Sequence, residues 1–367
     1  MRLIPRTPSA LPAAVAALLL IPAVSRPAAQ ASRPAGAVEH VRVHGPSLAG
    51  NLEGDDPDRM VSIYLPPGYA EAKTRRYPVV YLLHGFTDSD DRWFGRVQHF
   101  VNVPQAADKA LAAGTRDLII VMPNAFTKFK GSMYSTSVVT GDWESFIARD
   151  LVAYVDAHYR TIASAPGRGL AGHSMGGYGV LRIGMRHPSI FSSVYALSPC
   201  CMVPNLSPQR ETGPTGPSRA ETVKTQEEID KADFGTLAQL ASAAAWSPNP
   251  KNPPFFMDLP TKDGQPQPLV LAKWAANAPL AMVDSHLESL KGLTGLAIDA
   301  GDKDAGIAAT VQTLHAILVA NDVPHVFEIY EGDHVNRIGA RLETKVLPFF
   351  SDRLARDPSE PRAKSTR

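Results

Sequence analysis

Gly172-His173-Ser174-Met175-Gly176 is the stretch of sequence that decides the fold. It reads G-x-S-x-G, follows the apolar residues 169–171, and opens a helical pattern that continues to Met185. A serine between a strand and a helix sits on a turn so tight that its neighbours need almost no side chain. The context therefore predicts a nucleophile elbow with Ser174 at its tip. The alternative is a glycine-rich turn with an idle serine.

A serine is a poor nucleophile until a base removes its proton, so a histidine should follow it in the order nucleophile, acid, histidine. The histidines after Ser174 are His187, His286, His315, His325 and His334. His187 lies at the end of the nucleophile helix, and His286 lies in an irregular stretch. His315 lies inside an amphipathic helix, and His325 opens a strand. Only His334 follows the last predicted strand, where a loop can deliver it to the carboxyl edge of the sheet. His334 is the predicted general base.

The acid must come after the preceding strand and reach the far nitrogen of the imidazole. Asp299, Asp302 and Asp304 are the candidates. Asp299 still belongs to the strand, so the pleat fixes its side chain. Asp302 follows Gly301 at the apex of a turn, where a short side chain tends to cap its own backbone. Asp304 lies past the turn and is the predicted acid.

The third requirement is an oxyanion hole. One donor is expected to be the backbone N–H of Met175, the residue after the nucleophile. The other should come from the loop after the third strand, His84-Gly85-Phe86-Thr87, and we expect it to be the N–H of Phe86. The alternative for His84-Gly85 is a simple turn after a buried strand.

Strands and helices alternate along most of the chain. The predicted strands span 38–43, 60–65, 77–83, 118–122, 169–171, 193–197, 293–298 and 325–330, and the longer predicted helices span 143–159, 175–185 and 307–319. Such alternation predicts an α/β-hydrolase fold, with a mostly parallel central sheet and helices on both faces. The first two strands have no helix between them and are expected to form an antiparallel edge.

The pattern breaks down between Met202 and His286, in a stretch rich in proline and serine. A segment that long without sheet signals is usually a functional insertion. We expect residues 203–286 to form a cap over the cleft, with a helix at 227–244. Its aromatic residues Trp246, Phe255, Phe256 and Trp274 supply either a wall of the cleft or the core of the cap itself. The catalytic domain as a whole is expected to span 38–355.

The N-terminus carries the features of an export signal. Arg2 and Arg6 precede an apolar run, and Ala29-Gln30-Ala31 follows it as a small-residue cleavage site. Residues 1–31 are therefore interpreted as a signal peptide cleaved after Ala31, and 32–37 as a linker. The protein is expected to be secreted or periplasmic, without stable insertion in a membrane after cleavage. An uncleaved anchor helix is the alternative. Residues 356–367 are expected to form a polar tail.

The composition is that of a globular enzyme. Hydrophobic residues make up 44% of the 367, and 37 lysines and arginines nearly balance 36 aspartates and glutamates. A balance of that kind gives no sign of nucleic-acid binding. No metal site and no cofactor are predicted, and the acids in 88–91 read either as a solvated loop or as a cation site. Cys200 and Cys201 are neighbours with Cα atoms only ~3.8 Å apart, so free thiols are favoured over a strained bridge.

Taken together, these motifs resemble the esterase D family, which includes S-formylglutathione hydrolases, feruloyl esterase domains, enterochelin esterases and mycolyltransferases. The resemblance rests on residues 81–87, 172–177, 301–304 and 330–334, and covers about 38–354 apart from the insertion. Related members place the acid last in a Gly-x-x-Asp pattern, which matches Gly301 to Asp304. They also bring the segments around Tyr134 and Trp143 near the cleft, so both side chains are candidate substrate contacts, with core packing as the alternative.

The resemblance implies hydrolysis or transfer of an acyl ester through an acyl-serine. Export argues against the glutathione-thioester branch, whose substrate is cytosolic. The expected function is therefore a secreted serine carboxylesterase acting on an acylated sugar, an aromatic ester or another small ester. An acyltransferase of the mycolyltransferase type is the first alternative. A binding protein on an inactive hydrolase scaffold is the second, although such scaffolds usually lose a member of the triad.

Overall fold

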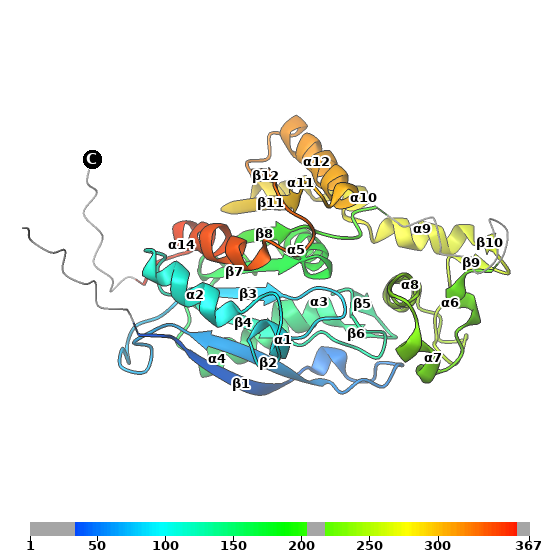
Figure 1. Cartoon of the computed structure of the whole chain (residues 1–367), viewed down its shortest axis with the longest axis horizontal. Coiled ribbons are helices and arrows are strands. Elements are labelled where there is room, and N and C mark those ends of the chain that lie inside the picture. The colour runs from blue at the N-terminus through cyan, green and yellow to red at the C-terminus, as the bar shows by residue number, and fades with distance from the viewer. Residues whose placement is uncertain (1–33, 204–216, 358–367) are drawn as a thin grey trace, which may run out of the picture. The chain divides into compact units, whose positions relative to one another are not determined.

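The structure is a computed structural model that describes residues 34–203 and 217–357. Within them, the central sheet contains β1 (Ala37–His44), β2 (Asp58–Leu65), β3 (Val79–Leu83), β4 (Ile119–Pro123), β7 (Arg168–His173), β8 (Ser193–Leu197), β11 (Gly295–Gly301) and β12 (Val326–Tyr330). Their order across the sheet is β1-β2-β4-β3-β7-β8-β11-β12 (Figure 1). Two small ribbons pair β5 (Thr136–Ser137) with β6 (Gly141–Asp142) and β9 (Thr261–Lys262) with β10 (Gln265–Pro266).

The direction of the strands matches the prediction. Each neighbouring pair from β4 to β12 is parallel, whereas β2 is antiparallel to both β1 and β4. The expected antiparallel edge is confirmed, with β1 outermost. Every residue of β3, β4, β7 and β8 is buried, because helices cover both faces of a parallel sheet.

Helices lie on both sides of this sheet (Figure 1). The α-helices of the described residues are α1 (Asp90–Trp93), α2 (Val103–Ala112), α3 (Trp143–Ser145), α4 (Leu151–His158), α5 (Met175–Arg186), α6 (Arg219–Thr222), α7 (Gln226–Lys231), α8 (Phe234–Trp246), α9 (Pro268–Ala276), α10 (Pro279–Met282), α11 (Leu287–Lys291), α12 (Ala305–Ala320), α13 (Ile338–Arg341) and α14 (Leu347–Arg353), and α6 to α9 of the insertion lie beyond the end of the sheet. Tyr81 packs in the cluster that includes Val180 of α5 and Val311 of α12, while Leu82 packs in the cluster that includes Phe350 of α14. Neighbouring residues of β3 thus serve two cores, and the α/β-hydrolase architecture is confirmed.

Two predicted helices differ from the observed ones. The helix expected at 143–159 contains a π-helical turn, Phe146–Asp150, between α3 and α4. The helix expected at 227–244 is two helices, α7 and α8, separated at Ala232 and Asp233. Ala232 is extended, and the Asp233 side chain accepts a hydrogen bond from the backbone N–H of Thr236. An aspartate that caps a helix N-terminus in this way starts a new helix, which periodicity alone does not reveal.

Both predicted boundaries of the catalytic domain, residues 38 and 355, lie within the described residues. The first strand begins at Ala37, inside the predicted linker, and the predicted signal peptide lies outside the described residues. At the other end, Asp357 falls in the predicted polar tail, but its carboxylate is buried and accepts a hydrogen bond from the Arg76 backbone N–H at 2.5 Å. The start of the tail is therefore anchored to the domain. None of the described helices is long and apolar enough to cross a membrane.

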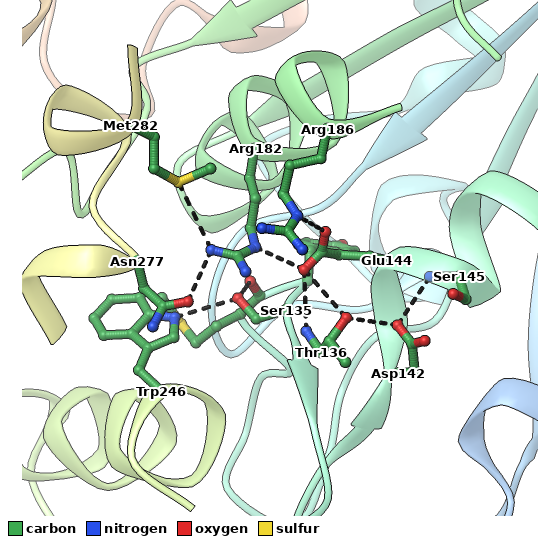
Figure 2. Close-up of polar contacts among 12 residues, drawn as sticks. Ser135, Thr136, Asp142, Glu144, Ser145, Arg182, Arg186, Trp246, Asn277 and Met282 are labelled. Carbon is green, nitrogen blue, oxygen red and sulfur yellow. Dashed lines mark hydrogen bonds and ion pairs between the residues drawn. The ribbon is translucent and has the colours of Figure 1, made fainter. Parts of the chain in front are cut away.

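A buried polar network joins the insertion to the nucleophile helix, as Figure 2 shows. Glu144 in α3 is 2% exposed and accepts hydrogen bonds from Arg182 Nε at 2.8 Å and from the Thr136 backbone N–H at 3.3 Å. Arg186 Nε lies 2.7 Å from the other carboxylate oxygen. The same Arg182 guanidinium donates to Asn277 Oδ1, which belongs to the insertion, at 2.8 Å. The Glu144 carboxylate thus fixes α5 against α3, and the Arg182 guanidinium joins α5 to the insertion.

We expect Glu144→Gln to be strongly destabilising. Burial alone would raise the pKa of this carboxyl, but the His187 imidazole and the two guanidinium groups outweigh burial and lower it to about 2. Loss of the charge leaves Arg182 buried without its counter-ion, at a cost of about 3–5 kcal/mol. Since the pKa is lowered, the stabilisation is complete above about pH 4.5 and is lost as the pH falls toward 2.

Urea unfolding of the parent protein and of Glu144→Gln, at pH 7 and at pH 3, measures the loss in the free energy of unfolding. The matched control is Glu227→Gln, which removes an exposed ion pair with Lys231 and should cost under ~1 kcal/mol. Equal costs for the two substitutions at pH 7 would contradict a stabilising role for the network.

Candidate active site

Ser174 sits on a strained turn between β7 and α5. Its φ of 57° and ψ of −115° fall in a region that non-glycine residues rarely occupy. The flanking glycines allow the turn, because a Cβ on Gly172 would lie 2.5 Å from the Gly176 backbone, and a Cβ on Gly176 would overlap the Leu83 carbonyl. The Ser174 backbone N–H donates to the Leu197 carbonyl at 3.0 Å, which ties the turn to β8. The G-x-S-x-G pattern therefore forms the predicted sharp turn, with Ser174 at its tip.

The structure brings the three predicted triad residues together. His334 Nε2 lies 2.9 Å from Ser174 Oγ, and His334 Nδ1 lies 2.5 Å from Asp304 Oδ2. The serine is 9% exposed, and the imidazole is about one third exposed, so a solute can reach both. With Nδ1–H donated to the carboxylate, Nε2 presents a lone pair to the serine hydroxyl. This is the tautomer that a general base needs.

The two rejected aspartates have other partners. Asp299 is fully buried in β11 and accepts hydrogen bonds from the Tyr195 hydroxyl and Arg341 Nε, both at 2.8 Å. Asp302 accepts a hydrogen bond from the Gly332 backbone N–H at 2.9 Å. The expectation that Asp302 caps its own turn was wrong, because the loop carrying His334 lies close enough to receive it. Asp302 thus holds that loop rather than the imidazole.

The predicted oxyanion loop is fixed from below by His84. This side chain is buried, its Nε2 accepts from the Ala125 backbone N–H at 2.8 Å, and its Nδ1 lies 2.8 Å from the Gly85 carbonyl oxygen. Since Nε2 accepts, Nδ1 carries the proton and donates to that carbonyl. Burial also lowers the pKa of His84, which keeps the ring neutral. The Gly85 carbonyl is therefore held on one side of a trans peptide, and the Phe86 N–H points to the other side.

Phe86 and Met175 converge at Gly131. A Cβ on Gly131 would lie 2.5 Å from the Phe86 ring and 2.7 Å from Met175 Sδ, so only glycine fits between them. Within residues 34–203 and 217–357, neither the Phe86 nor the Met175 backbone N–H donates a hydrogen bond to a protein acceptor. The two predicted oxyanion donors are thus both available at the nucleophile elbow.

The predicted substrate contacts Tyr134 and Trp143 are core residues instead. Tyr134 is 0% exposed and Trp143 is 1% exposed. The Tyr134 hydroxyl donates to the His84 carbonyl at 3.2 Å, and Trp143 Nε1 donates to the Thr140 carbonyl at 2.8 Å. The sequence could not separate these roles, because an aromatic residue near the cleft and one beneath it have the same local pattern. Tyr134 supports the oxyanion loop from inside the core.

Two of the three acids at 88–91 are buried, so the solvated-loop alternative holds only for Asp91, whose side chain is 40% exposed. Asp88 is buried, accepts a hydrogen bond from Trp93 Nε1 at 2.8 Å and lies 3.1 Å from His99 Nε2. Asp90 is also buried and accepts from the Ser62 hydroxyl at 2.6 Å. Among the described residues, Asp90, Asp91 and His40 bring ligand-type atoms within 4.8 Å of one another.

The aromatic residues predicted for the insertion pack into a core that the insertion shares with the rest of the domain. Trp246 and Trp274 are buried and pack edge to face at 5.4 Å. Phe255 packs against Phe129 at 5.7 Å, and Phe256 packs partly buried against the same core. The residue that sequence reasoning missed is Phe234, at the start of α8. Only its position after the Asp233 cap could have indicated where its ring would project.

Phe234 meets the predicted oxyanion loop. It is 65% exposed, and its ring lies edge to face with Phe86 at 5.5 Å between centroids. The insertion is also bonded to the loop that contains Gly131, through the Lys130–Asp230 ion pair and a 3.2 Å hydrogen bond from Gln226 to the Lys128 carbonyl. An apolar side chain of the insertion thus packs against the Phe86 ring.

The two cysteines also lie at this site. The Cys200 backbone N–H donates to the Ser174 carbonyl at 3.1 Å, and both cysteines are free thiols, as predicted. The hydrogen bond with Cys201 and burial raise the pKa of the Cys200 thiol. Cys200 is therefore a neutral thiol next to Ser174.

Curated relatives match a restricted part of the chain. Esterase Rv1288 of Mycobacterium tuberculosis is 36% identical over 135 residues, which cover 36% of this chain and 27% of the relative. An endo-1,4-beta-xylanase/feruloyl esterase of Xylanibacter ruminicola is 32% identical over 136 residues, which cover 35% of this chain and 18% of the relative. The alignments thus span about a quarter or less of the relatives' own length.

Solved structures match most of the chain. A ferulic acid esterase superposes with a TM-score of 0.60 at 20% identity, covering 88% of this chain and 99% of the other. An S-formylglutathione hydrolase from Staphylococcus aureus gives a TM-score of 0.54 at 16% identity, covering 86% and 99%. At these identities the likeness shows the α/β-hydrolase fold. The family model described as "Putative esterase" matches residues 56–337, which is well over half of the chain. The chain therefore belongs to this family of putative esterases.

Proposed function

We propose that this protein is a serine carboxylesterase that hydrolyses its substrate through an acyl-serine intermediate. The observation that carries the proposal is the chain of contacts from Asp304 Oδ2 through His334 to Ser174 Oγ, at 2.5 and 2.9 Å. The strained elbow and the two available N–H groups of Phe86 and Met175 complete the set of parts that acyl transfer to serine requires.

In the first half-reaction, His334 Nε2 takes the proton of Ser174 as Oγ attacks the ester carbonyl carbon. The carbonyl oxygen becomes an oxyanion, which the N–H groups of Phe86 and Met175 stabilise. The C–O bond to the alcohol then breaks, and His334 gives the proton to the departing alkoxide. In the second half-reaction a water attacks the acyl-serine by the same steps and releases the acid. Asp304 stays ionised and stabilises the imidazolium in both halves.

The geometry of the insertion favours an ester with an aromatic or other apolar group. Phe86 carries a proposed oxyanion donor, and its ring packs against the exposed Phe234 ring, which is therefore placed to contact an apolar group of the substrate. Aromatic pairs gain about 0.5–1.5 kcal/mol beyond simple burial. The names of the related feruloyl and ferulic acid esterases support the same choice. We therefore place hydroxycinnamate and similar aryl esters first among the substrates.

A panel of esters tests this function. The purified protein should hydrolyse 4-nitrophenyl acetate, and should hydrolyse methyl hydroxycinnamates with higher kcat/KM than aliphatic methyl esters. Phe234→Ala should lower kcat/KM about 10-fold on the hydroxycinnamates and leave acetate turnover nearly unchanged. Leu269→Ala, which removes another exposed apolar side chain of the insertion, is the matched control. No turnover of any ester would refute the function, and equal losses on both substrates would refute the role of Phe234.

Repeating the panel with a polyol acceptor separates hydrolysis from acyl transfer. In a hydrolase, the released acid accounts for nearly all the ester consumed, with or without the acceptor. If a new ester of the polyol replaced the acid as the main product, the acyltransferase alternative would hold.

We also propose that the protein is exported, on the basis of its N-terminal sequence. The two arginines, the apolar run and Ala29-Gln30-Ala31 form the order of a cleaved signal. Mass analysis of protein from the culture medium or periplasm of the native host should place the N-terminus at Ser32 or a close neighbour. Intact Met1 on protein from the cytoplasmic fraction would count against export.

A further inference from the structure

His173, the residue before the nucleophile, contacts the main chain of the proposed base. It ends β7, is 2% exposed, and its Nε2 lies 2.8 Å from the carbonyl oxygen of His334. The two imidazole rings lie 4.6 Å apart between centroids. On the other side, the Trp93 ring packs against His173 at 6.1 Å. The side chain is thus enclosed between the loop carrying His334 and α1.

The contacts of His173 define its tautomer. A carbonyl oxygen only accepts, so Nε2 must carry the proton and donate it to His334. Nδ1 is buried and has no hydrogen-bond partner among the described residues, which fits an unprotonated nitrogen. Burial, together with the neighbouring His334, lowers the pKa of His173 to about 3. The ring is therefore neutral at neutral pH, with Nε2–H as its donor.

The loop carrying His334 is otherwise held mainly from the acid side. Asp302 accepts from the Gly332 N–H, and the Lys303 backbone N–H donates to the Gly332 carbonyl at 2.9 Å. Both contacts join the loop to the segment that leads to Asp304. The bond from His173 joins the loop to the strand that leads to Ser174. The position of the imidazole relative to the serine therefore depends on this bond.

We propose that His173 is a positioning residue, whose Nε2–H fixes the main chain of His334 so that the imidazole reaches both Ser174 and Asp304. The inference rests on the proposed serine-esterase function. It assigns the His173 side chain no contact with the substrate and no part in proton transfer. A displacement of about 1 Å at a catalytic group costs about 10²-fold in rate, so a donor that prevents it matters for kcat.

A nearly isosteric pair of variants tests the proposal. His173→Gln keeps an N–H donor at about the same reach, whereas His173→Met has a similar shape and no donor. On 4-nitrophenyl acetate, His173→Met should lose about 10²-fold in kcat with KM nearly unchanged, and His173→Gln should stay within about 10-fold of the parent. Equal losses in the two variants, or full activity of His173→Met, would overturn the role of the donor.

Proton NMR gives a readout that loss of stability alone would not move. The Nδ1–H of His334, bonded to Asp304, should give a low-field resonance that is retained in His173→Gln and shifted or broadened in His173→Met. Leu318→Ala, a core substitution away from the site, controls for lower stability and should leave the resonance unchanged. An unchanged resonance in folded His173→Met would overturn the proposal.

Nitrogen NMR of the unsubstituted protein applies even if both His173 variants fail to fold. A neutral His173 with Nε2–H supports the proposal, and protonation at Nδ1 alone overturns it. These readouts do not depend on turnover. If the parent protein hydrolysed no ester but both NMR experiments gave the expected result, the proposed function would be wrong. The position of His173 and its hydrogen bond to His334 would still be supported.

Discussion

Replacing Ser174 by alanine is expected to lower kcat by about 10⁴- to 10⁶-fold, because the three triad residues act as a unit and the remaining groups only bind and polarise the ester. The fold should survive the change. The serine hydroxyl contacts the side chains of His334 and Cys200, while the backbone of the elbow is held by its own hydrogen bonds to Leu197, Tyr178 and Cys200. Removing the Ser174 hydroxyl from this strained turn should therefore not destabilise the protein.

Single-turnover kinetics and a fluorophosphonate probe measure the effect. The parent protein should react with the probe at Ser174, as peptide mapping will show, and Ser174→Ala should not react. Ser193→Ala is the matched control, since Ser193 is a fully buried serine of β8 whose hydroxyl has no hydrogen-bond partner within the described residues. Labelling at another residue, or near-normal turnover by Ser174→Ala, would remove Ser174 from the mechanism.

Asp304→Asn is expected to lower kcat by about 10⁴-fold. The amide can occupy the same space, but its NH₂ group offers a donor where the imidazole needs an acceptor. His334 then turns to the tautomer with its proton on Nε2 and cannot take the proton of Ser174. The 2.5 Å contact between Asp304 Oδ2 and His334 Nδ1 makes this the side chain on which the tautomer depends.

Asp302→Asn is the control for that substitution. Asp302 holds the Gly332 N–H, and an asparagine carbonyl oxygen can still accept this hydrogen bond, so we expect a loss of about 10-fold or less. Measuring kcat for both variants on the same ester decides between the two aspartates. A larger loss for Asp302→Asn than for Asp304→Asn would show that the acid lies earlier in the loop.

The sequence by itself determined the parts of this protein that local rules control. The glycines around Ser174 identified the elbow, because a strand-to-helix turn with a strained serine tolerates almost no neighbouring side chain. Chain order then selected His334 from five histidines, since loops after successive parallel strands meet at one edge of the sheet, and the place past the turn selected Asp304 from three aspartates. The fold followed from the same alternation of strands and helices. The catalytic roles of Ser174, His334 and Asp304 stay predictions that the substitutions above will test.

The tertiary structure alone decided which side chains face each other across the chain. Tyr134 and Trp143 turned out to be core residues, and Phe234, which carried no motif, reaches the oxyanion loop because a cap at Asp233 redirects the chain. Local pattern reports how a side chain relates to its own strand or helix. Local pattern does not predict which residues from distant segments will contact that side chain, as the hydrogen bond from His173 to the His334 carbonyl shows. Packing partners of this kind are fixed only when the whole sheet and its loops have come together.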